Sequence, residues 1–333
     1  MVVVLKCENN LVTDWYMEML GEALQEIGED IVYVDKIDKV LKYPKTSIIV
    51  VARILDALTL NLKGYKRNIM WFQGVEPEES LMRNNSKIRF WILSKIEKIV
   101  LKKAKFSLFV SNEMANHYKT KYKIDLDKKK YYCMPCQNTG IHKFAFQQPD
   151  KYRDNVFAYI GSLAVWQKFE ETVECYVKCE KIGLPNTKLV VYTSEGEKAE
   201  KILQDKGVRN YIVDFVPNEK LPEKLKNVKY GFIIRDDNIV NRVATPTKIS
   251  TYLSCGLIPI YSDVLKDFSH IAEELKYAVL YDEKLEQRLL QLNSEKIKNE
   301  DVLEEYNTVF ETYYNKELHK KNLINMLSEC MKY

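Results

Sequence analysis

The chain has 333 residues, of which 46% are hydrophobic and 29% are charged, and its formal net charge is +4 at pH 7. This length suits two domains better than one, and the composition is ordinary for a soluble globular protein. No window of 18 apolar residues predicts a membrane span, and a modest charge without a recognised binding motif does not indicate a nucleic-acid partner.

The first half of the chain alternates strand-like and helix-like segments. The N-terminal run Met1–Leu5 is followed by Lys6 and Glu8 rather than by a cleavage site, so we interpret it as a buried strand and not as a signal peptide. By periodicity, strands are expected at 2–5, 31–34, 46–51, 68–72, 106–110 and 130–134, and helices at 14–27, 87–103 and 113–122. Such alternation predicts a parallel sheet covered by helices on both faces.

A polar, aperiodic segment at 141–155 is interpreted as a linker, and the alternation restarts after it. Further strands are expected at 156–160, 188–192, 211–214, 230–234 and 258–261, and helices at 169–182, 195–206, 220–227 and near Ala272. The sequence thus predicts two α/β domains, 1–145 and 156–310, and a C-terminal helical segment, 311–333, that could pack back on the first domain. In such folds, ligands bind at the carboxyl ends of the strands.

The cysteines are odd in number and scattered, which predicts reduced thiols and a cytoplasmic protein. They are Cys7, Cys133, Cys136, Cys175, Cys179, Cys255 and Cys330. Cys133 and Cys136 form a CxxC pattern, but neither a second pair nor an N-terminal βαβ unit accompanies it. We therefore interpret these two as ordinary thiols rather than as zinc ligands or a redox centre.

The most informative segment is 244–260, which predicts a polar loop, a short helix and a buried strand. Lys248 would stand at the helix N-terminus, and Arg235 at the end of the preceding strand. Two cations beside free backbone N–H groups make a plausible diphosphate site, so the segment indicates an enzyme that handles a nucleotide-linked group. The alternatives are a solvated Lys248 and an ion pair of Arg235 with Asp236 or Asp237.

The sequence predicts no metal and no other cofactor. Its four histidines are isolated: they are His117, His142, His270 and His319. Asp236 and Asp237 are the nearest candidates for a divalent ion, but adjacent side chains in an extended segment point in opposite directions.

Four segments, taken in order, carry a family pattern. They are Trp71-Phe-Gln-Gly-Val-Glu-Pro-Glu-Glu79, Phe109-Val-Ser-Asn-Glu-Met114, Ala158-Tyr-Ile-Gly-Ser-Leu163 with Trp166-Gln-Lys168, and Pro246-Thr-Lys-Ile-Ser-Thr-Tyr-Leu-Ser-Cys-Gly256 with Ile258-Pro-Ile260. Together they resemble the family-4 retaining glycosyltransferases of the GT-B fold, especially bacterial members that build surface polysaccharides. The resemblance implies two Rossmann-like domains with parallel sheets facing a central cleft, the first binding the acceptor and the second the donor.

The resemblance also implies a reaction and its residues. A sugar would move from a nucleoside diphosphate sugar to a glycan or lipid-linked glycan by front-face attack, with the donor phosphate taking the acceptor's proton. The implied positions are Arg235 and Lys248 for catalysis, Gly161, Ser162, Lys168, Thr247 and Thr251 for the donor, and Gln73, Gly74, Glu76 and Glu79 for the acceptor.

Several positions depart from the family pattern. Its two glutamates would fall near Val243 and at Thr251, its acceptor-domain histidine at Gln73, and an arginine at Ser162. These departures keep two other classes open: a non-catalytic GT-B partner or glycan-binding subunit of an active transferase, and another nucleotide-sugar enzyme such as an epimerase. In the plainer interpretation, Lys168 is an exposed lysine and the acceptor-side glutamates are solvated loop acids.

Basic residues concentrate in the first domain, where the segment from Lys87 to Lys130 contains thirteen Lys or Arg and four acids. Residues 87–103 predict an amphipathic helix. Its apolar face is expected in the core and consists of Ile88, Trp91, Ile92, Ile96, Ile99 and Val100. Its lysines could attract an anionic membrane surface, which predicts a peripheral position on the inner face of the membrane.

Overall fold

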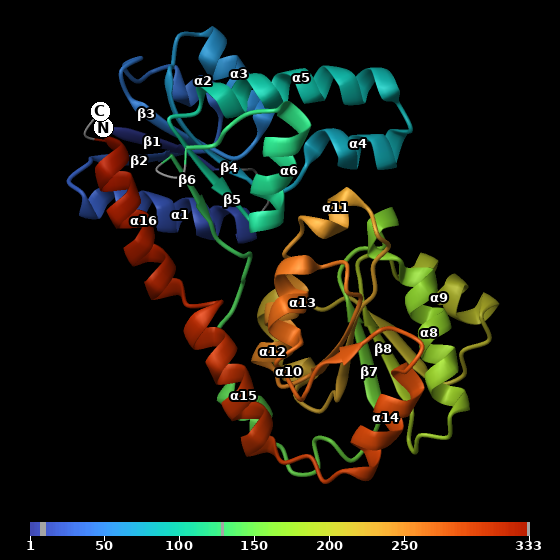
Figure 1. The fold of residues 1–333 in the computed structure, drawn as a ribbon. Helices are drawn as coiled ribbons and strands as arrows, with labels where there is room; N and C mark the ends of the chain where they lie inside the picture. The colour runs from blue at the N-terminus through green and yellow to red at the C-terminus, as the bar shows by residue number, and fades with distance from the viewer. Residues whose placement is uncertain (7–10, 128–129, 332–333) are drawn as a thin grey trace. The chain divides into compact units, whose positions relative to one another are not determined.

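The structure is a computed structural model that describes residues 1–6, 11–127 and 130–331, so Cys7, Lys128 and Lys129 lie outside the described residues. The chain forms two compact units (Figure 1). Residues 1–135 and 315–333 make up the first unit, and residues 136–314 make up the second.

The first unit is built on a six-stranded sheet in the order β2-β1-β3-β4-β5-β6, with all neighbouring strands parallel. The strands are β1 (Val2–Leu5), β2 (Ile31–Val34), β3 (Ile48–Val51), β4 (Arg67–Phe72), β5 (Phe106–Phe109) and β6 (Tyr131–Cys133). The helices are α1 (Leu11–Glu26), α2 (Ile37–Val40), α3 (Ile54–Leu62), α4 (Glu76–Asn84), α5 (Lys87–Lys103), α6 (Asn112–Tyr122) and α16 (Lys316–Met331). Every residue of β1, β3 and β5 is buried, as expected for parallel strands covered on both faces.

The C-terminal helix α16 belongs to the first unit, where it packs against α1 (Figure 1). Leu323 and Leu327 on α16 are fully buried. Lys320 forms ion pairs with Glu22 at 3.2 Å and with Glu26 at 2.7 Å on α1. Apolar burial and complementary charge therefore join the last helix of the chain to the first.

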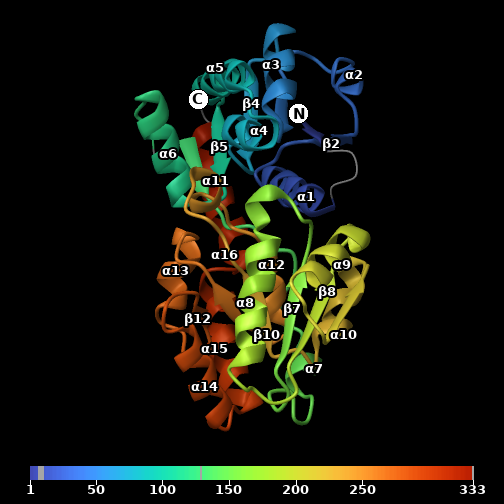
Figure 2. The same ribbon diagram turned by 90° about the vertical axis from the view of Figure 1, so that its right-hand side faces the viewer.

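The second unit repeats the architecture with a parallel sheet in the order β12-β11-β10-β7-β8-β9. The strands are β7 (Val156–Ile160), β8 (Lys188–Tyr192), β9 (Tyr211–Asp214), β10 (Tyr230–Ile233), β11 (Ile258–Tyr261) and β12 (Val279–Leu280). The α-helices are α7 (Lys143–Phe146), α8 (Phe169–Lys181), α9 (Gly196–Asp205), α10 (Leu221–Leu225), α11 (Ile239–Arg242), α12 (Thr247–Ser254), α13 (Lys266–Ala272), α14 (Leu285–Ser294) and α15 (Asn299–Thr312), and the 3₁₀ turns are η2 (Val165–Gln167) and η3 (Asn218–Lys220). Helices α8 and α9 cover one face of the sheet, and α12 and α13 lie on the other (Figures 1 and 2).

Residues 136–155, which include the expected linker, pack on the second unit. Phe146 and Tyr152 are buried, and the Tyr152 hydroxyl donates a hydrogen bond to the Gly256 carbonyl at 2.8 Å. Gly256 follows α12 with φ +71°, a backbone conformation that favours glycine. A Cβ added there would also lie only 2.8 Å from the Phe146 ring, so a larger residue would not fit. The change of unit therefore falls between Pro135 and Cys136, ahead of the polar segment.

The glutamates after β4 do not lie in a loop. Glu76 and Glu79 stand in the first turn of α4, and the helix ends at Asn85 with the left-handed φ of 47°. Pro77, between these glutamates, occupies a position in the first helical turn where its missing N–H is harmless. The plainer interpretation of solvated loop acids is thus wrong for both glutamates, since burial also raises the pKa of each.

Helix α5 has the predicted bounds but not the predicted orientation. Leu93, Glu97, Val100 and Leu101 are its buried residues. Four of the apolar residues expected in the core are exposed: they are Ile88, Trp91, Ile92 and Ile99. The helix has apolar residues on both sides, and the side that packs inward is the one centred on Glu97. None of the helices in the described part of the chain has the length and apolarity needed to cross a membrane.

Candidate functional site

The second unit brings together the two cations expected at a diphosphate site. Arg235 follows β10, Lys248 is the second residue of α12, and both are buried. They converge on Gln167, whose side-chain Oε1 accepts a hydrogen bond from Lys248 Nζ at 2.9 Å and another from Arg235 Nη2. Arg235 Nη1 also donates to the Gln167 backbone carbonyl at 3.0 Å. Within the described residues, neither cation has a carboxylate partner.

Burial without a counter-ion changes the acid–base properties of both cations. It lowers the pKa of Lys248 well below the usual range, and the nearby Arg235 lowers it further. Burial likewise lowers the pKa of Arg235 to about 10. The Lys248 ammonium lies 4.3 Å from the centre of the Tyr159 ring, which offers only a weak counter-charge. Two like charges held by neutral acceptors form a site that a bound anion would stabilise.

Backbone groups next to these cations also suit an anion. Helix α12 begins after Pro246, whose side chain provides no cap for the first N–H groups. Gly161 follows β7 with φ +109°, and a Cβ added there would lie 3.8 Å from Lys248 Nζ. Gly161 and the neighbouring Ser162 are exposed. An uncapped helix N-terminus, a glycine turn and two cations therefore meet at the carboxyl ends of β7 and β10.

The other residues predicted for the donor have partners within the second unit. Lys168 forms ion pairs with Glu171 and, at 3.0 Å, with Asp236. The Thr251 hydroxyl donates to Asn138 Oδ1 at 3.1 Å or to the Thr247 carbonyl at 3.2 Å. Lys168 is therefore already neutralised, whereas Lys248 is not, and the two lysines differ in what they can offer an anion.

The two aspartates considered for a metal or for an ion pair with Arg235 bind other cations. Asp236 accepts from Lys168, and Asp237 accepts from Arg242 Nη2 at 2.8 Å. The interpretation of Arg235 as the ion-pair partner of either aspartate is therefore wrong. In the part of the chain that the structure describes, no three His, Cys, Asp or Glu side chains are grouped as metal ligands.

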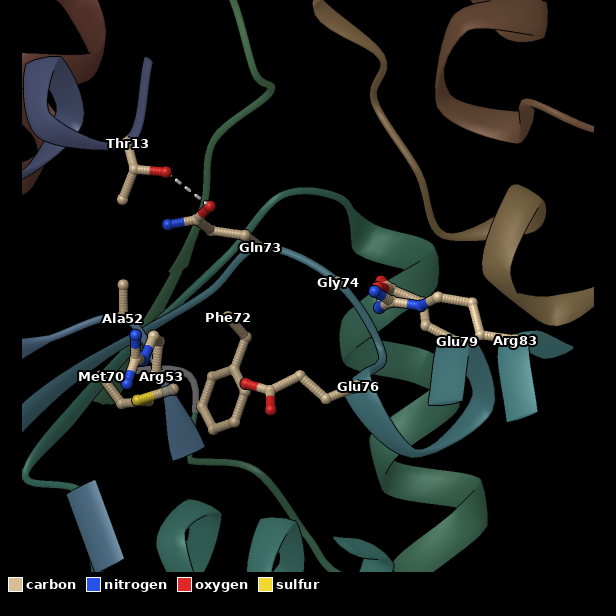
Figure 3. A pocket seen from close by; sticks show the side chains of 10 residues that line it. All are labelled: Thr13, Ala52, Arg53, Met70, Phe72, Gln73, Gly74, Glu76, Glu79 and Arg83. Atoms are coloured by element: carbon tan, nitrogen blue, oxygen red, sulfur yellow. Dashed lines mark hydrogen bonds and ion pairs between the residues drawn. The ribbon is translucent and has the colours of Figure 1, made fainter. Parts of the chain in front are cut away.

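The first unit contains a pocket of about 570 Å³ at the carboxyl ends of its central strands (Figure 3). It is lined by Thr13, Ala52, Arg53, Met70, Phe72, Gln73, Gly74, Glu76, Glu79 and Arg83. All four residues predicted to bind the acceptor line it. At one end the Thr13 hydroxyl donates to Gln73 Oε1 at 2.9 Å, and at another Arg83 pairs with Glu79 at 3.2 Å. The pocket thus offers donors, acceptors and one aromatic face, a combination that suits a sugar.

Glu76 is the carboxylate of this pocket that is least compensated. Its Oε1 accepts from the Ile54 backbone N–H at 3.2 Å, and Figure 3 shows its carboxyl group turned toward the part lined by Phe72 and Arg53. Burial raises the pKa of Glu76 to about 7. Burial also raises the pKa of Glu79, whose Oε1 would clash with a Cβ added at Gly74, so the glycine leaves room for this carboxylate.

A buried polar cluster holds α4 in place beneath the pocket. Lys121 on α6 forms ion pairs with Glu78 of α4 at 2.8 Å and with Glu97 of α5 at 2.9 Å. The Tyr118 hydroxyl lies 3.2 Å from Glu97 Oε1 and 3.3 Å from the Gly74 carbonyl, so it joins the cluster to the glycine turn. His117 completes the cluster through Glu78 Oε1 at 3.1 Å. These residues position the acceptor-side glutamates without lining the pocket.

Sequence reasoning missed several residues that shape these sites. Gln167 lies in the segment Trp166-Gln-Lys168 but was given no role there, and Asn138 carries no sequence signal, because neutral amides are common in loops. Arg53 is different: it directly follows the residue after β3, and a charged side chain beyond a buried strand is a usual sign of a site. The spacing of His117 and Lys121, one helical turn apart, also indicated a common face toward a partner.

No protein-family model matches the chain, and no curated protein matches it. Several solved structures, however, match the chain in fold. Sucrose-phosphate synthase from Thermosynechococcus elongatus matches with a TM-score of 0.70 and 11% identity over 99% of both chains. The lipopolysaccharide outer core galactosyltransferase WaaB, in its apo form, matches with a TM-score of 0.66 and 13% identity over 98% of this chain and 99% of that one.

A third solved structure contains nucleotide. S. aureus TarM, as a point mutant in complex with Fondaparinux, alpha-GlcNAc-glycerol and UDP, matches with a TM-score of 0.57 and 13% identity. The match covers 87% of this chain but only 58% of TarM, so the chain spans little more than half of that protein. Two six-stranded parallel sheets and these matches confirm the predicted fold: the chain has the GT-B fold found in glycosyltransferases.

Proposed function

We propose that the protein is a glycosyltransferase that uses a nucleoside diphosphate sugar as its donor. The observation that carries this proposal is the pair of buried cations, Arg235 and Lys248, which share the neutral Gln167 amide and have no carboxylate partner among the described residues. A diphosphate supplies the negative charge that the pair lacks. The GT-B fold, with UDP in a complex of one matched structure, supports the same donor class.

The cation pair also suits the chemistry of sugar transfer. As the glycosidic bond to the donor breaks, negative charge develops on the leaving diphosphate, and preorganised cations in a dry site stabilise that charge most effectively. Arg235 and Lys248 would contact the leaving group, and the first N–H groups of α12 would add to them. Gly161, Ser162, Thr247 and Thr251 would complete the donor site, with the Thr251 hydroxyl offered to the ribose.

The acceptor would bind in the pocket of the first unit. Gln73, Glu76 and Glu79 present amide and carboxylate groups to sugar hydroxyls, and Gly74 makes room for Glu79. We propose a glycan or lipid-linked glycan as the acceptor and a role in bacterial surface polysaccharide synthesis, as in the family-4 enzymes that the sequence resembles. A location at the inner face of the membrane depends on a different part of the molecule, helix α5.

Retention of the anomeric configuration is part of the proposal, and it needs no protein nucleophile. In front-face attack the donor phosphate takes the acceptor's proton, so Glu76 only binds. A second mechanism, inversion with Glu76 as general base, is favoured by one observation: the Glu76 carboxyl group lies in the pocket with a pKa of about 7. The anomeric configuration of the product, measured by NMR, distinguishes the two.

Transfer should not require a divalent metal. The two aspartates nearest the cation pair are already engaged with Lys168 and Arg242. A T4 phage protein of similar fold is described in complex with UDP and Mn²⁺, so the question needs a direct test. We expect activity to persist in EDTA. Activity lost on chelation and restored by Mg²⁺ or Mn²⁺ would contradict this part of the proposal.

The function is tested first by ligand binding and then by turnover. UDP, ADP and GDP, each at about a hundred times its Kd, should raise the unfolding free energy by about 2.7 kcal/mol if they bind the folded protein alone. Release of nucleoside diphosphate that depends on an added glycan establishes a transferase. Binding without turnover would favour a non-catalytic partner, and conversion of the donor sugar without an acceptor would favour an epimerase.

A further inference from the structure

The outward face of helix α5 combines exposed apolar side chains with cations. Ile88, Ile92 and Ile99 recur at intervals of four and seven residues, which places them on one side of the helix. They are 76%, 48% and 41% exposed, and Trp91 beside them is 61% exposed. Side chains of this size normally cluster inside a domain, so a row of four on one exposed helix face marks an interaction surface.

Positive and negative charges lie on opposite faces of helix α5. Six of its residues are Lys or Arg, and Glu97 is the one acid. Glu97 is fully buried on the inward side, where it binds Lys121 and two tyrosine hydroxyls. Lys95 and Lys102 lie on the outward side and are exposed. The outward face of α5 is therefore apolar along its centre and carries positive charge without negative charge.

We propose that this face, defined by Ile88, Trp91, Ile92, Lys95, Ile99 and Lys102, docks on an anionic lipid bilayer with α5 parallel to the surface. The isoleucines and Trp91 enter the boundary between headgroups and acyl chains, and the lysines bind anionic headgroups. The inference extends the proposed function, since a lipid-linked acceptor would be reached at such a surface. It differs from the prediction from sequence, in which the apolar residues stay in the core and only the lysines face lipid.

The charge pattern selects this partner over others. A second copy of the chain would place the same cations against one another across a symmetric interface, which costs free energy. Interfacial helices have this composition: Trp and large aliphatic residues on the face that enters lipid, and Lys or Arg at its border. Trp91 has a further property, because Lys95 Nζ lies 5.2 Å from the centre of its ring, so a cation and an aromatic ring are presented side by side.

The test measures binding of the full-length protein to vesicles without nucleotide or acceptor. We expect sedimentation with vesicles of phosphatidylglycerol and phosphatidylcholine at low salt, and a blue shift of the tryptophan emission that is lost in Trp91→Phe. Binding should weaken at high salt, because the Debye length falls from about 10 Å at 0.1 M to about 3 Å at 1 M. Pure phosphatidylcholine vesicles should bind much less protein.

Two matched pairs of variants distinguish lipid binding by this face from nonspecific hydrophobic adsorption and from an effect of net charge. Ile88→Ser with Ile92→Ser should lower vesicle affinity about tenfold or more, whereas Ile212→Ser with Phe215→Ser, at two exposed apolar residues of the second unit, should not. Lys95→Glu with Lys102→Glu should also lower it about tenfold or more, whereas Lys198→Glu with Lys201→Glu, which changes the net charge equally, should not. All variants alter exposed residues, and an unchanged thermal shift with UDP shows that the donor site is intact.

Three outcomes would overturn the inference. One is no binding to anionic vesicles at low salt. Another is binding that the α5 variants and their controls weaken equally. The third is a concentration-dependent dimer in the absence of lipid that the α5 variants abolish, which would make the face a contact between two copies. Each can occur whether or not the protein binds UDP, so a failure here is distinct from a failure of the proposed function.

Discussion

The two candidate sites hold buried charges of opposite sign that form no ion pair within the part of the chain that the structure describes. In the second unit, burial lowers the pKa of Lys248 and of Arg235, and among the described residues their side chains donate only to the Gln167 amide and to backbone carbonyls. In the first unit, burial raises the pKa of Glu76, which accepts from one backbone N–H. The buried charge that is costly to keep ionised is therefore positive in the second unit and negative in the first.

This difference indicates which ligand each site takes. A pair of cations gains most from a multiply charged anion, because both pKa values return toward normal when it binds. The pocket of Glu76 also contains a second carboxylate, Glu79, and its arginines already form ion pairs, Arg53 with Asp56 and Arg83 with Glu79. Glu76 therefore gains most from neutral hydroxyl donors, since the two carboxylates would repel an anionic ligand. We therefore expect the diphosphate to bind in the second unit and a polyol in the first, and substitutions in each site can break this expectation.

The largest effect is expected when either cation is removed. Lys248→Ala and Arg235→Ala should each lose roughly 2–4 kcal/mol of transition-state stabilisation, about thirtyfold to a thousandfold in kcat/KM, because charge on the leaving diphosphate loses a preorganised partner. The fold should survive, since removing a buried charge without a counter-ion does not weaken the folded state. Steady-state kinetics and thermal unfolding measure the two effects.

Lys168→Ala is the matched control. This lysine lies near the same strand ends but already has Glu171 and Asp236 as partners. Its removal should change kcat/KM far less than the removal of Lys248. Equal losses in all three variants would show that general positive charge, and not the unpaired cations, supports the reaction. Unchanged kcat/KM in Lys248→Ala and Arg235→Ala would sink the donor assignment.

A somewhat smaller effect is expected at Gln167, where stability and binding should change in opposite directions. Gln167→Glu places a carboxylate between Arg235 and Lys248, so the unfolding midpoint should rise. The nucleotide must then displace this internal anion, and its affinity should fall about tenfold to a hundredfold, or roughly 1.5–3 kcal/mol. Calorimetric titration with UDP and thermal unfolding supply the two measurements.

Gln167→Ala serves as the opposite case. Without the amide the cations lose a shared acceptor, so the protein should be less stable while UDP binds at least as tightly as to the wild type. If Gln167→Glu binds UDP with wild-type affinity, the diphosphate does not lie at this cation pair. The Gln167 variants thus test where the anion binds, which the alanine variants of the cations cannot do alone.

The sequence allowed the sheets and the cation pair to be predicted for physical reasons. Buried parallel strands are continuous β-branched runs, as in Ile48–Val51, and they leave a clear pattern. Arg235 and Lys248 could be paired because a strand end and a helix start are recognisable positions that meet at one edge of a parallel sheet. Whether the residues of the donor and acceptor sites act as assigned stays a prediction.

Other features depended on contacts that the sequence does not encode locally. Helix α5 has apolar residues on both faces, so periodicity could not decide between the side of Leu93 and the side of Ile92. The role of Gln167 arises only when two cations from β10 and α12 converge on it. Helix α4 is a different case, because Pro77 and the acids around it are a recognised helix start, so this local signal predicts the observed helix rather than a loop.

The smallest effect, and the one that tests the first unit, is expected at Glu76. Glu76→Gln should weaken acceptor binding by about 1 kcal/mol, because a hydroxyl group donates more strongly to a carboxylate than to an amide, which still accepts the hydrogen bond. The pKa of about 7 in the folded protein makes this binding depend on pH. Acceptor affinity in the wild type should rise as pH increases through 7, where the carboxyl group ionises, and it should be flat in Glu76→Gln.

Stability should show the opposite pH dependence, and this gives an independent check. A carboxyl group whose folded pKa is raised to about 7 from its ordinary value of 4.5 binds more protons folded than unfolded between these values. The unfolding free energy of the wild type should therefore fall as pH rises through this window, and Glu76→Gln should lose that slope. If kcat in Glu76→Gln fell a hundredfold or more with an unchanged acceptor KM, Glu76 would be a general base rather than a binding group, and the inverting mechanism would replace the retaining one.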